Sequence, residues 1–86
     1  MATYQVVVSK QAAKEIEKLT ADVVQRIIPS IVALANNPRP AGCKKLKGGK
    51  DLYRIRVGDY RLVYSIEDTI LVVDVRRVAH RRDVYD

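Results

Sequence analysis

The chain has 86 residues, of which 48% are hydrophobic, so it suits one compact domain over residues 1–86 and is too short for a second core. Its 16 Lys and Arg against 10 Asp and Glu give a formal net charge of +6, which favours polyanionic partners. No apolar run reaches the roughly 20 residues of a membrane span, the N-terminal MATYQVVVSK lacks a signal-peptide layout, and Cys43 has no partner cysteine. We therefore expect a cytoplasmic protein with no membrane association, no disulfide, no metal site and no cofactor.

The first half of the chain predicts a strand followed by a helical hairpin. Thr3 to Val8 is rich in β-branched residues, as is typical of a strand. Ser9 and Thr20 are expected N-caps of two helices, and Pro29 predicts a kink in the second helix or two short helices in its place. Apolar residues at helical spacing are expected to face the core: Ala12, Ala13, Ile16, Leu19, Val24, Ile27, Ile28, Ile31 and Leu34.

The second half changes to a periodicity of two, in the runs LYRIRV, YRLVYSI and TILVVDVRRV. Gly58-Asp59 and Glu67-Asp68 separate these runs by two residues, the length that tight hairpins prefer. We therefore predict a three-stranded antiparallel meander. The whole order, strand-helix-helix-strand-strand-strand, indicates an α+β fold in which the helical hairpin packs on one face of an antiparallel sheet and leaves the other face open.

The two turns predict which strand residues lie opposite one another. With Gly58-Asp59 as turn residues, Arg56 pairs with Arg61, and the same rule at the second turn pairs Arg61 with Asp74. Side chains alternate between the faces of a strand. The expected core face holds Tyr53, Ile55, Val57, Tyr60, Leu62, Tyr64, Leu71, Val73 and Val75, and the expected opposite face holds Arg54, Arg56, Arg61, Asp74 and Arg76.

Positive charge is concentrated in one segment, which has eight basic residues against two acidic ones: Arg39, Lys44, Lys45, Lys47, Lys50, Arg54, Arg56 and Arg61 against Asp51 and Asp59. Like charges directly opposite in a sheet are unfavourable, so three clustered arginines beside a single Asp74 call for an anion, and guanidinium groups match phosphate oxygens. Taken alone, these arginines are equally consistent with solvated surface charges. The lysine loop is likewise either a solvated loop or a wall that steers phosphate.

Three sequence segments resemble the RelE/ParE superfamily of toxins: LYRIRVGDYRLVY, the preceding loop AGCKKLKG, and the terminal VAHRRDVYD. The similarity also covers the helical hairpin ending in NNPRP, so it spans essentially the whole chain. The resemblance implies a cytoplasmic toxin held in a heteromeric complex by a cognate antitoxin. RelE-like members are ribosome-dependent, metal-independent endoribonucleases that cleave mRNA by attack of the ribose 2′-hydroxyl, which leaves a 2′,3′-cyclic phosphate.

The resemblance also implies roles for individual residues. Arg54 and Arg61 would bind the scissile phosphate and stabilise its transition-state charge, and Arg56 lies where relatives place a second basic residue on the strand. Arg81 would act on the leaving 5′-oxygen, and Tyr85 would stack on the nucleotide or take part in proton transfer. Further contacts to substrate are expected from a basic group made up of Lys44, Lys45, Lys47, Lys50, Arg76 and Arg82.

The general base is the point at which this chain departs from some of its relatives. They carry a lysine where this chain has Arg56, and a guanidinium is a poor proton acceptor near neutral pH. His80 is the best titratable alternative, although a histidine that merely ends a strand is an equally good interpretation. Asp74 comes second, and an orienting ion pair with Arg61 suits it better than catalysis.

Two other functions stay open. ParE-like members share the fold and poison DNA gyrase, which needs none of the nuclease residues. The retained basic cluster favours the ribonuclease over the gyrase poison. A degenerate scaffold that only binds an antitoxin is the third possibility, and growth arrest on expression without a partner would exclude it.

Overall fold

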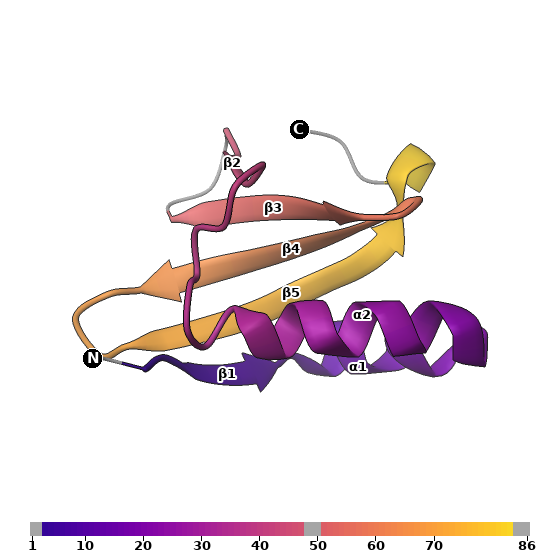
Figure 1. Cartoon of the computed structure of the whole chain (residues 1–86), viewed down its shortest axis with the longest axis horizontal. Coiled ribbons are helices and arrows are strands. Elements are labelled where there is room, and N and C mark those ends of the chain that lie inside the picture. The colour runs from indigo at the N-terminus through magenta and orange to yellow at the C-terminus, as the bar shows by residue number, and fades with distance from the viewer. Residues whose placement is uncertain (1–2, 48–50, 84–86) are drawn as a thin grey trace.

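The computed structural model describes residues 3–47 and 51–83, together with the side chains of all of these except Asp83. Two helices, α1 (Lys10–Glu17) and α2 (Ala21–Ala33), pack on one face of a five-stranded sheet (Figure 1). The strands are β1 (Gln5–Val8), β2 (Lys44–Lys45), β3 (Leu52–Val57), β4 (Tyr60–Glu67) and β5 (Val72–His80), and the short 3₁₀ helix η1 (Arg81–Asp83) follows. The predicted α+β fold and element order are confirmed.

The sheet order is β1-β5-β4-β3-β2, which gives the first strand a place that its sequence alone did not predict. β1 runs parallel to β5, with Gln5 opposite Val72 and Val8 opposite Val75, whereas every other pair is antiparallel. The sheet is therefore mixed and not wholly antiparallel. A parallel neighbour requires a long crossover, and the whole stretch from α1 to β4 supplies it.

Ser9 and Thr20 both take the predicted N-cap positions. The Ser9 hydroxyl accepts a hydrogen bond from the Ala12 N–H at 3.1 Å, whereas the Thr20 side chain makes no capping hydrogen bond and only its carbonyl accepts from Val24, at 3.0 Å. The prediction of two short helices in place of the second one is wrong, because α2 continues through Pro29. Proline lacks only one donor, and the buried residues Ile27 and Ile31 on either side of it hold the helix to the sheet.

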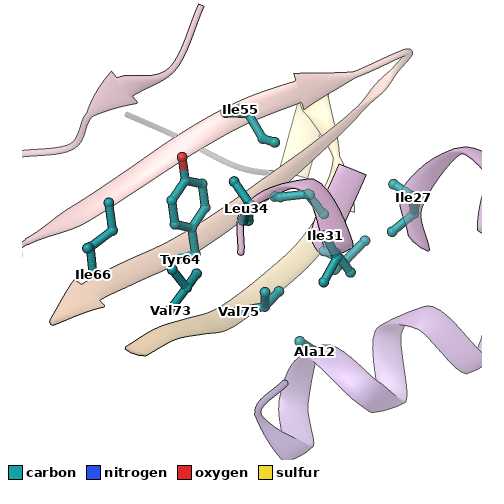
Figure 2. Close-up of a cluster of buried hydrophobic side chains, with 11 residues drawn as sticks. Ala12, Ile27, Ile31, Leu34, Ile55, Tyr64, Ile66, Val73 and Val75 are labelled. Carbon is teal, nitrogen blue, oxygen red and sulfur yellow. The ribbon is translucent and has the colours of Figure 1, made fainter. Parts of the chain in front are cut away.

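The core lies between the helices and the sheet (Figure 2). Its buried residues come from both layers: Ala12, Ile27, Ile31 and Leu34 from the helical side, and Ile55, Leu62, Tyr64, Ile66, Val73, Val75 and Val78 from the strands. Tyr53 and Tyr60 pack against this cluster, which confirms the core-facing prediction for the three strand tyrosines. Ala13 and Ile28, both expected in the core, are exposed because they lie to the side of the buried helical stripe.

The first hairpin has the predicted register. Val57 lies opposite Tyr60, Arg56 opposite Arg61 and Arg54 opposite Val63. Gly58 takes φ +61°, a left-handed conformation that costs glycine little and that two-residue hairpins need.

The second hairpin differs from its prediction. β4 runs on through Glu67, which pairs with Val72, so the turn has four residues, Asp68 to Leu71, and Leu71 takes φ +55°. Val63 then pairs with Arg77 while Tyr64 pairs with Val75, so Arg76 is the extra residue of a β-bulge. As a result Arg61 lies opposite Ala79, and the predicted pairing of Arg61 with Asp74 is wrong. Leu71, expected on the core face, lies in the turn instead.

The face opposite the helices is only partly open. Arg54, Val63 and Ser65 on this face are 8%, 7% and 7% exposed. Val63 and Ser65 are short side chains in the middle of the sheet, and strands flank them on both sides, so longer neighbouring side chains shield them from solvent. The prediction of a fully open face is therefore wrong at its centre.

Candidate functional site

Three arginines from adjacent strands form what we call the arginine face: Arg54, Arg56 and Arg61. The β3–β4 hairpin sets Arg56 directly opposite Arg61, and Arg54 precedes Arg56 by two residues, so all three side chains leave the same side of the sheet. On β5, the residue opposite Arg61 is Ala79, which has a short, uncharged side chain. The face therefore gathers three positive charges on two neighbouring strands.

The three arginines differ in their access to solvent. Arg54 is buried and Arg61 is half-buried, and the Nε atoms of both are shielded from water. Arg56 is exposed, and its Nε donates a hydrogen bond to the Gly58 carbonyl at 2.9 Å, which fixes the guanidinium beside the hairpin turn. Cationic groups that are partly removed from water attract an anion more strongly than solvated ones, so the arginine face is suited to a phosphate group.

Arg81 lies close to the same turn. Its backbone N–H donates to the Asp59 carbonyl at 2.8 Å, and its Nε lies 4.0 Å from an Asp59 carboxylate oxygen. Since Arg56 is bonded to Gly58 and Arg81 to Asp59, both arginines flank the β3–β4 turn at one end of the arginine face. The structure thus places Arg81 beside the turn that Arg56 also contacts, and its grouping with Arg54 and Arg61 stays a prediction.

His80 lies on the other side of the sheet. It is opposite Tyr60, a core-face residue, and the two rings meet edge to face with centroids 5.5 Å apart. Its Nδ1 accepts a hydrogen bond from the Arg82 N–H at 3.4 Å. The structure therefore does not bring His80 together with the arginine face.

The remaining basic residues divide in a way that the sequence did not reveal. Lys44 pairs with Arg54 and so extends the arginine face, whereas Lys45 pairs with Tyr53 and belongs to the opposite face. Arg76 forms an ion pair with Asp74, Nε to Oδ2 3.2 Å, so Asp74 neutralises Arg76 and not Arg61. Lys47 and Arg82 are exposed. Lys50 and Tyr85 lie outside the described residues.

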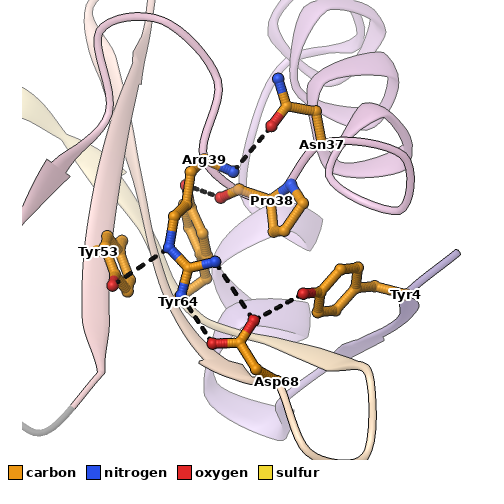
Figure 3. A network of polar contacts seen from close by, with 7 residues as sticks. All are labelled: Tyr4, Asn37, Pro38, Arg39, Tyr53, Tyr64 and Asp68. Atoms are coloured by element: carbon orange, nitrogen blue, oxygen red, sulfur yellow. Dashed lines mark hydrogen bonds and ion pairs between the residues drawn. The ribbon is translucent and has the colours of Figure 1, made fainter. Parts of the chain in front are cut away.

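A polar network that the sequence did not predict joins the N-terminal strand, the linker after α2 and the β4–β5 turn (Figure 3). Arg39 donates from both terminal nitrogens to the Asp68 carboxylate, at 2.9 and 3.3 Å, and Tyr4 donates to the same carboxylate at 2.6 Å. Arg39 also donates from Nε to the Tyr53 hydroxyl at 3.3 Å, and its guanidinium carbon lies over the Tyr53 ring, 5.1 Å from the ring centroid. Arg39 thus has a structural role, although it belongs to the basic segment of the sequence.

The network shifts the ionisation of its members. Hydrogen bonds from Arg39 and Tyr4 hold the pKa of the Asp68 carboxyl below its usual value, and the bond to Asp68 raises the pKa of the Tyr4 phenol. Nearby, burial raises the pKa of Tyr64, whose hydroxyl donates to the Pro38 carbonyl at 2.8 Å. No local sequence motif marks this network, because Arg39 and Asp68 are 29 residues apart.

Two negative findings apply to the part of the chain that the structure describes. Neither helix there is long and apolar enough to cross a bilayer. In the same residues, no three His, Cys, Asp or Glu side chains gather in a group that could hold a metal ion.

Comparison with known proteins shows the family to which the chain belongs. The model of the family "ParE toxin of type II toxin-antitoxin system, parDE" matches residues 6–85. Toxin RelE3 of Methanocaldococcus jannaschii is 35% identical, with 94% of each chain covered. This chain belongs to the RelE/ParE toxin family.

Other RelE relatives agree in sequence and in shape. The mRNA interferase toxin RelE of Escherichia coli K12 is 35% identical over 84% of this chain and 77% of its own length. The RelE-RelB complex of Pyrococcus horikoshii contains a chain that matches with a TM-score of 0.83 and 31% identity, over 95% of this chain and 99% of that one. The chain is thus a RelE-like toxin of a toxin–antitoxin system, as its terminal and hairpin motifs predicted.

Proposed function

We propose that this RelE-like toxin is an endoribonuclease that inhibits translation and arrests growth by cleaving mRNA on the ribosome. The observation that carries the proposal is the arginine face, where Arg54, Arg56 and Arg61 leave the same side of two adjacent strands. The name mRNA interferase, which the Escherichia coli relative bears, supports RNA as the substrate. No metal ion or cofactor is needed for the proposed chemistry.

In the proposed reaction the ribose 2′-hydroxyl loses its proton and attacks the adjacent phosphorus. The bond from phosphorus to the 5′-oxygen breaks, and the products are a 2′,3′-cyclic phosphate and a 5′-hydroxyl that takes up a proton. Arg61 and Arg54 bind the non-bridging oxygens and stabilise the charge that develops in the transition state. Arg81, beside the hairpin turn, donates to the leaving 5′-oxygen, and Tyr85 is assigned to nucleotide stacking by family resemblance alone.

Among the residues that the structure describes, none of the three candidates Arg56, His80 and Asp74 is placed to accept the proton. Arg56 is a guanidinium, and His80 lies on the opposite face of the sheet against Tyr60. Asp74 is engaged with Arg76. We therefore propose that catalysis is mainly electrostatic, with ribosomal groups or solvent accepting the proton, which also gives a reason for ribosome dependence.

A cognate antitoxin is the proposed protein partner, in a heteromeric cytoplasmic complex. Its support is the Pyrococcus horikoshii relative, which was solved as a complex with RelB. A concentrated basic surface favours an acidic or amphipathic partner segment that covers it. If the antitoxin complex left the arginine face fully reactive to a guanidine-modifying reagent, direct occlusion would be excluded.

A ParE-like gyrase poison is the second candidate, because the matching family model carries the ParE name. Its observable is an accumulation of gyrase–DNA cleavage complexes while messenger stays uncut. The arginine face argues for the ribonuclease, since gyrase poisoning makes no demand for a phosphate site on the sheet.

The deciding experiment is induced expression followed by mapping of messenger 5′ ends. Wild type is compared with Arg61→Ala and Tyr85→Ala, and with Lys14→Ala as a control on the exposed surface of α1. Cuts are expected for wild type and the control and for neither of the other two variants. A 2′-deoxy substitution at the cut site that left cleavage intact would disprove attack by the 2′-hydroxyl.

A further inference from the structure

A groove of about 420 Å³ runs between the C-terminal half of α2, the linker that follows it and the outer edge of β3. Its lining is largely apolar: Ala33, Leu34, Pro40, Ala41, Ile55 and Val57. Gly42 and three polar residues, Ser30, Asn37 and Arg56, complete it. The volume lies within the range of about 300–1,000 Å³ that is usual for small-ligand pockets.

The groove exists because the sheet is incomplete at this edge. β2 has only two residues, which pair with Tyr53 and Arg54. Beyond them, within residues 3–47 and 51–83, no strand lies along the outer edge of Ile55, Arg56 and Val57. Apolar surface that would otherwise be covered by a longer strand is therefore left as the floor of the groove.

One wall of the groove is held in place before any ligand binds. This wall is the linker from Asn37 to Gly42, and Figure 3 shows its first residues within the polar network. The Pro38 carbonyl is bonded to Tyr64, Arg39 is bonded to Asp68, and the Asn37 side-chain oxygen accepts the Arg39 N–H at 3.2 Å. That last bond turns the Asn37 amide nitrogen away from Arg39 and fixes the orientation of this lining side chain (Figure 3).

The groove and the arginine face share Arg56. This residue lines the groove and is the direct cross-strand partner of Arg61. The groove lies on the helix side of the sheet and the arginine face on the other, so the two meet across the edge of β3 at Arg56, and a polymer with a phosphate at Arg61 reaches the groove by crossing that edge. Arg56 is the one charged residue of the lining, so the groove offers a cationic entrance and an apolar interior with a fixed amide.

We propose that the groove is a nucleobase subsite, which receives an unstacked base of the RNA next to the scissile phosphate. The assignment rests on the proposed function, because that function puts the phosphate on the arginine face. Single-stranded RNA is read through bases that leave the stack and enter apolar sites with a few polar groups, which is the composition of this groove. The subsite would give the toxin a base preference at one position beside the cut.

A binding experiment tests the subsite without requiring cleavage. The ¹⁵N-labelled full chain is titrated with each 5′-nucleoside monophosphate and, as a probe without a base, with ribose 5-phosphate. The monophosphates are expected to shift the amide signals of Ala33, Asn37 and Gly42, whereas ribose 5-phosphate shifts only signals of the arginine face. Equal patterns for the two probes would overturn the subsite.

Filling the groove supplies the matched variant. Ala33→Leu replaces a methyl group of the lining by an isobutyl group at an exposed helical position, and Ala13→Leu makes the same change on α1, away from the groove. Ala33→Leu should weaken monophosphate binding about tenfold, the order of effect of a misfit in an apolar pocket, and Ala13→Leu should not. If Ala33→Leu instead lowered only the affinity for the antitoxin, the groove would hold a protein segment and the subsite would be wrong.

Cleavage mapping then separates this inference from the function on which it rests. With a library of messengers randomised around the cut, Ala33→Leu is expected to flatten the base preference at one position, while Ala13→Leu keeps the wild-type profile. An unchanged profile in Ala33→Leu overturns the subsite. If wild type cuts no messenger although the monophosphates still shift the groove signals, the ribonuclease assignment fails and the base site stands.

Discussion

The hydroxyl of Tyr64 gives the sharpest test of how the linker is attached to the sheet. Tyr64 has no solvent exposure, and its hydroxyl donates at 2.8 Å to the carbonyl of Pro38, which is itself buried. Tyr64→Phe keeps the ring and removes the donor, so the carbonyl loses this buried partner. An unsatisfied buried polar group costs about 1–3 kcal/mol, and we expect Tyr64→Phe to lower the free energy of unfolding by about 1.5 kcal/mol.

Tyr53 provides the matched control, because its ring stacks on that of Tyr64 with centroids 6.1 Å apart. Its hydroxyl accepts a hydrogen bond from the exposed Arg39 at 3.3 Å, so Tyr53→Phe should change the free energy of unfolding by less than about 0.5 kcal/mol. Urea unfolding followed by circular dichroism measures both variants. For a domain of this size Tyr64→Phe should lower Tm by about 6–12 °C. The slope of the free energy of unfolding against urea concentration should stay unchanged.

High pH provides an independent readout of the same residue. Burial raises the pKa of Tyr64 above its ordinary value of 10.0, so the phenol stays neutral in the folded chain while it ionises in the unfolded one. The contribution of Tyr64 to the free energy of unfolding is therefore fully present below pH 10, and it falls by about 1.4 kcal/mol for each pH unit above that value. Tyr64→Phe should remove that part of the alkaline loss. Equal stability of the two Phe variants at neutral pH would refute the buried bond.

Three further predictions concern the site and the network. Lys44→Ala should lower kcat/KM for messenger cleavage several-fold and reduce the dependence of kcat/KM on salt. Lys45→Ala, which changes the opposite face, should keep kcat/KM within about twofold of wild type, and equal losses in the two variants would contradict the register. His80→Ala should cleave within about threefold of wild type, whereas a general base would cost about 10²–10⁴, so a hundredfold loss would restore His80 to the mechanism. Because the pKa of Asp68 is lowered, mainly by Arg39, its contribution to stability is present above the ordinary value of 3.8 and lost as the pH falls further. Asp68→Asn should therefore flatten the acid limb of a urea-midpoint series, and an unchanged limb would exclude the network as its cause.

Local chemistry explains why the first hairpin could be predicted pair by pair and the second could not. Gly58 fixes a two-residue turn by its own backbone freedom, so every pair from Val57 and Tyr60 outward follows from the sequence. The second turn depends on long-range contacts of Asp68 with Tyr4 and Arg39. Those partners come from the start of the chain and from the linker after α2, and no pattern within the hairpin announces them.

The faces were predicted better than the pairs, because the error in the second turn was an even number of residues. The predicted turn paired Arg61 with Asp74, whereas the observed ladder before the bulge pairs Ser65 with Asp74, four residues further along β4. A slip of four residues preserves alternation, so Val73 and Val75 remain in the core and Asp74 remains on the opposite face. Each residue therefore lies on its predicted face but opposite another partner than predicted, which is why Asp74 forms an ion pair with Arg76 and not with Arg61.

The bulge at Arg76 then decides the composition of the site. Strict alternation from Asp74 would send Val78 and His80 to the arginine face, and Ala79 to the core. The extra residue reverses this order, so Val78 is buried in the core, His80 meets Tyr60, and Ala79 lies opposite Arg61. The spacing of the buried valines reflects the bulge, because they lie at positions 73, 75 and 78, and the last step is three residues where a regular strand has two. A single inserted residue thus places the methyl group of Ala79, and not a titratable side chain, opposite Arg61, and it takes His80 to the other face of the sheet.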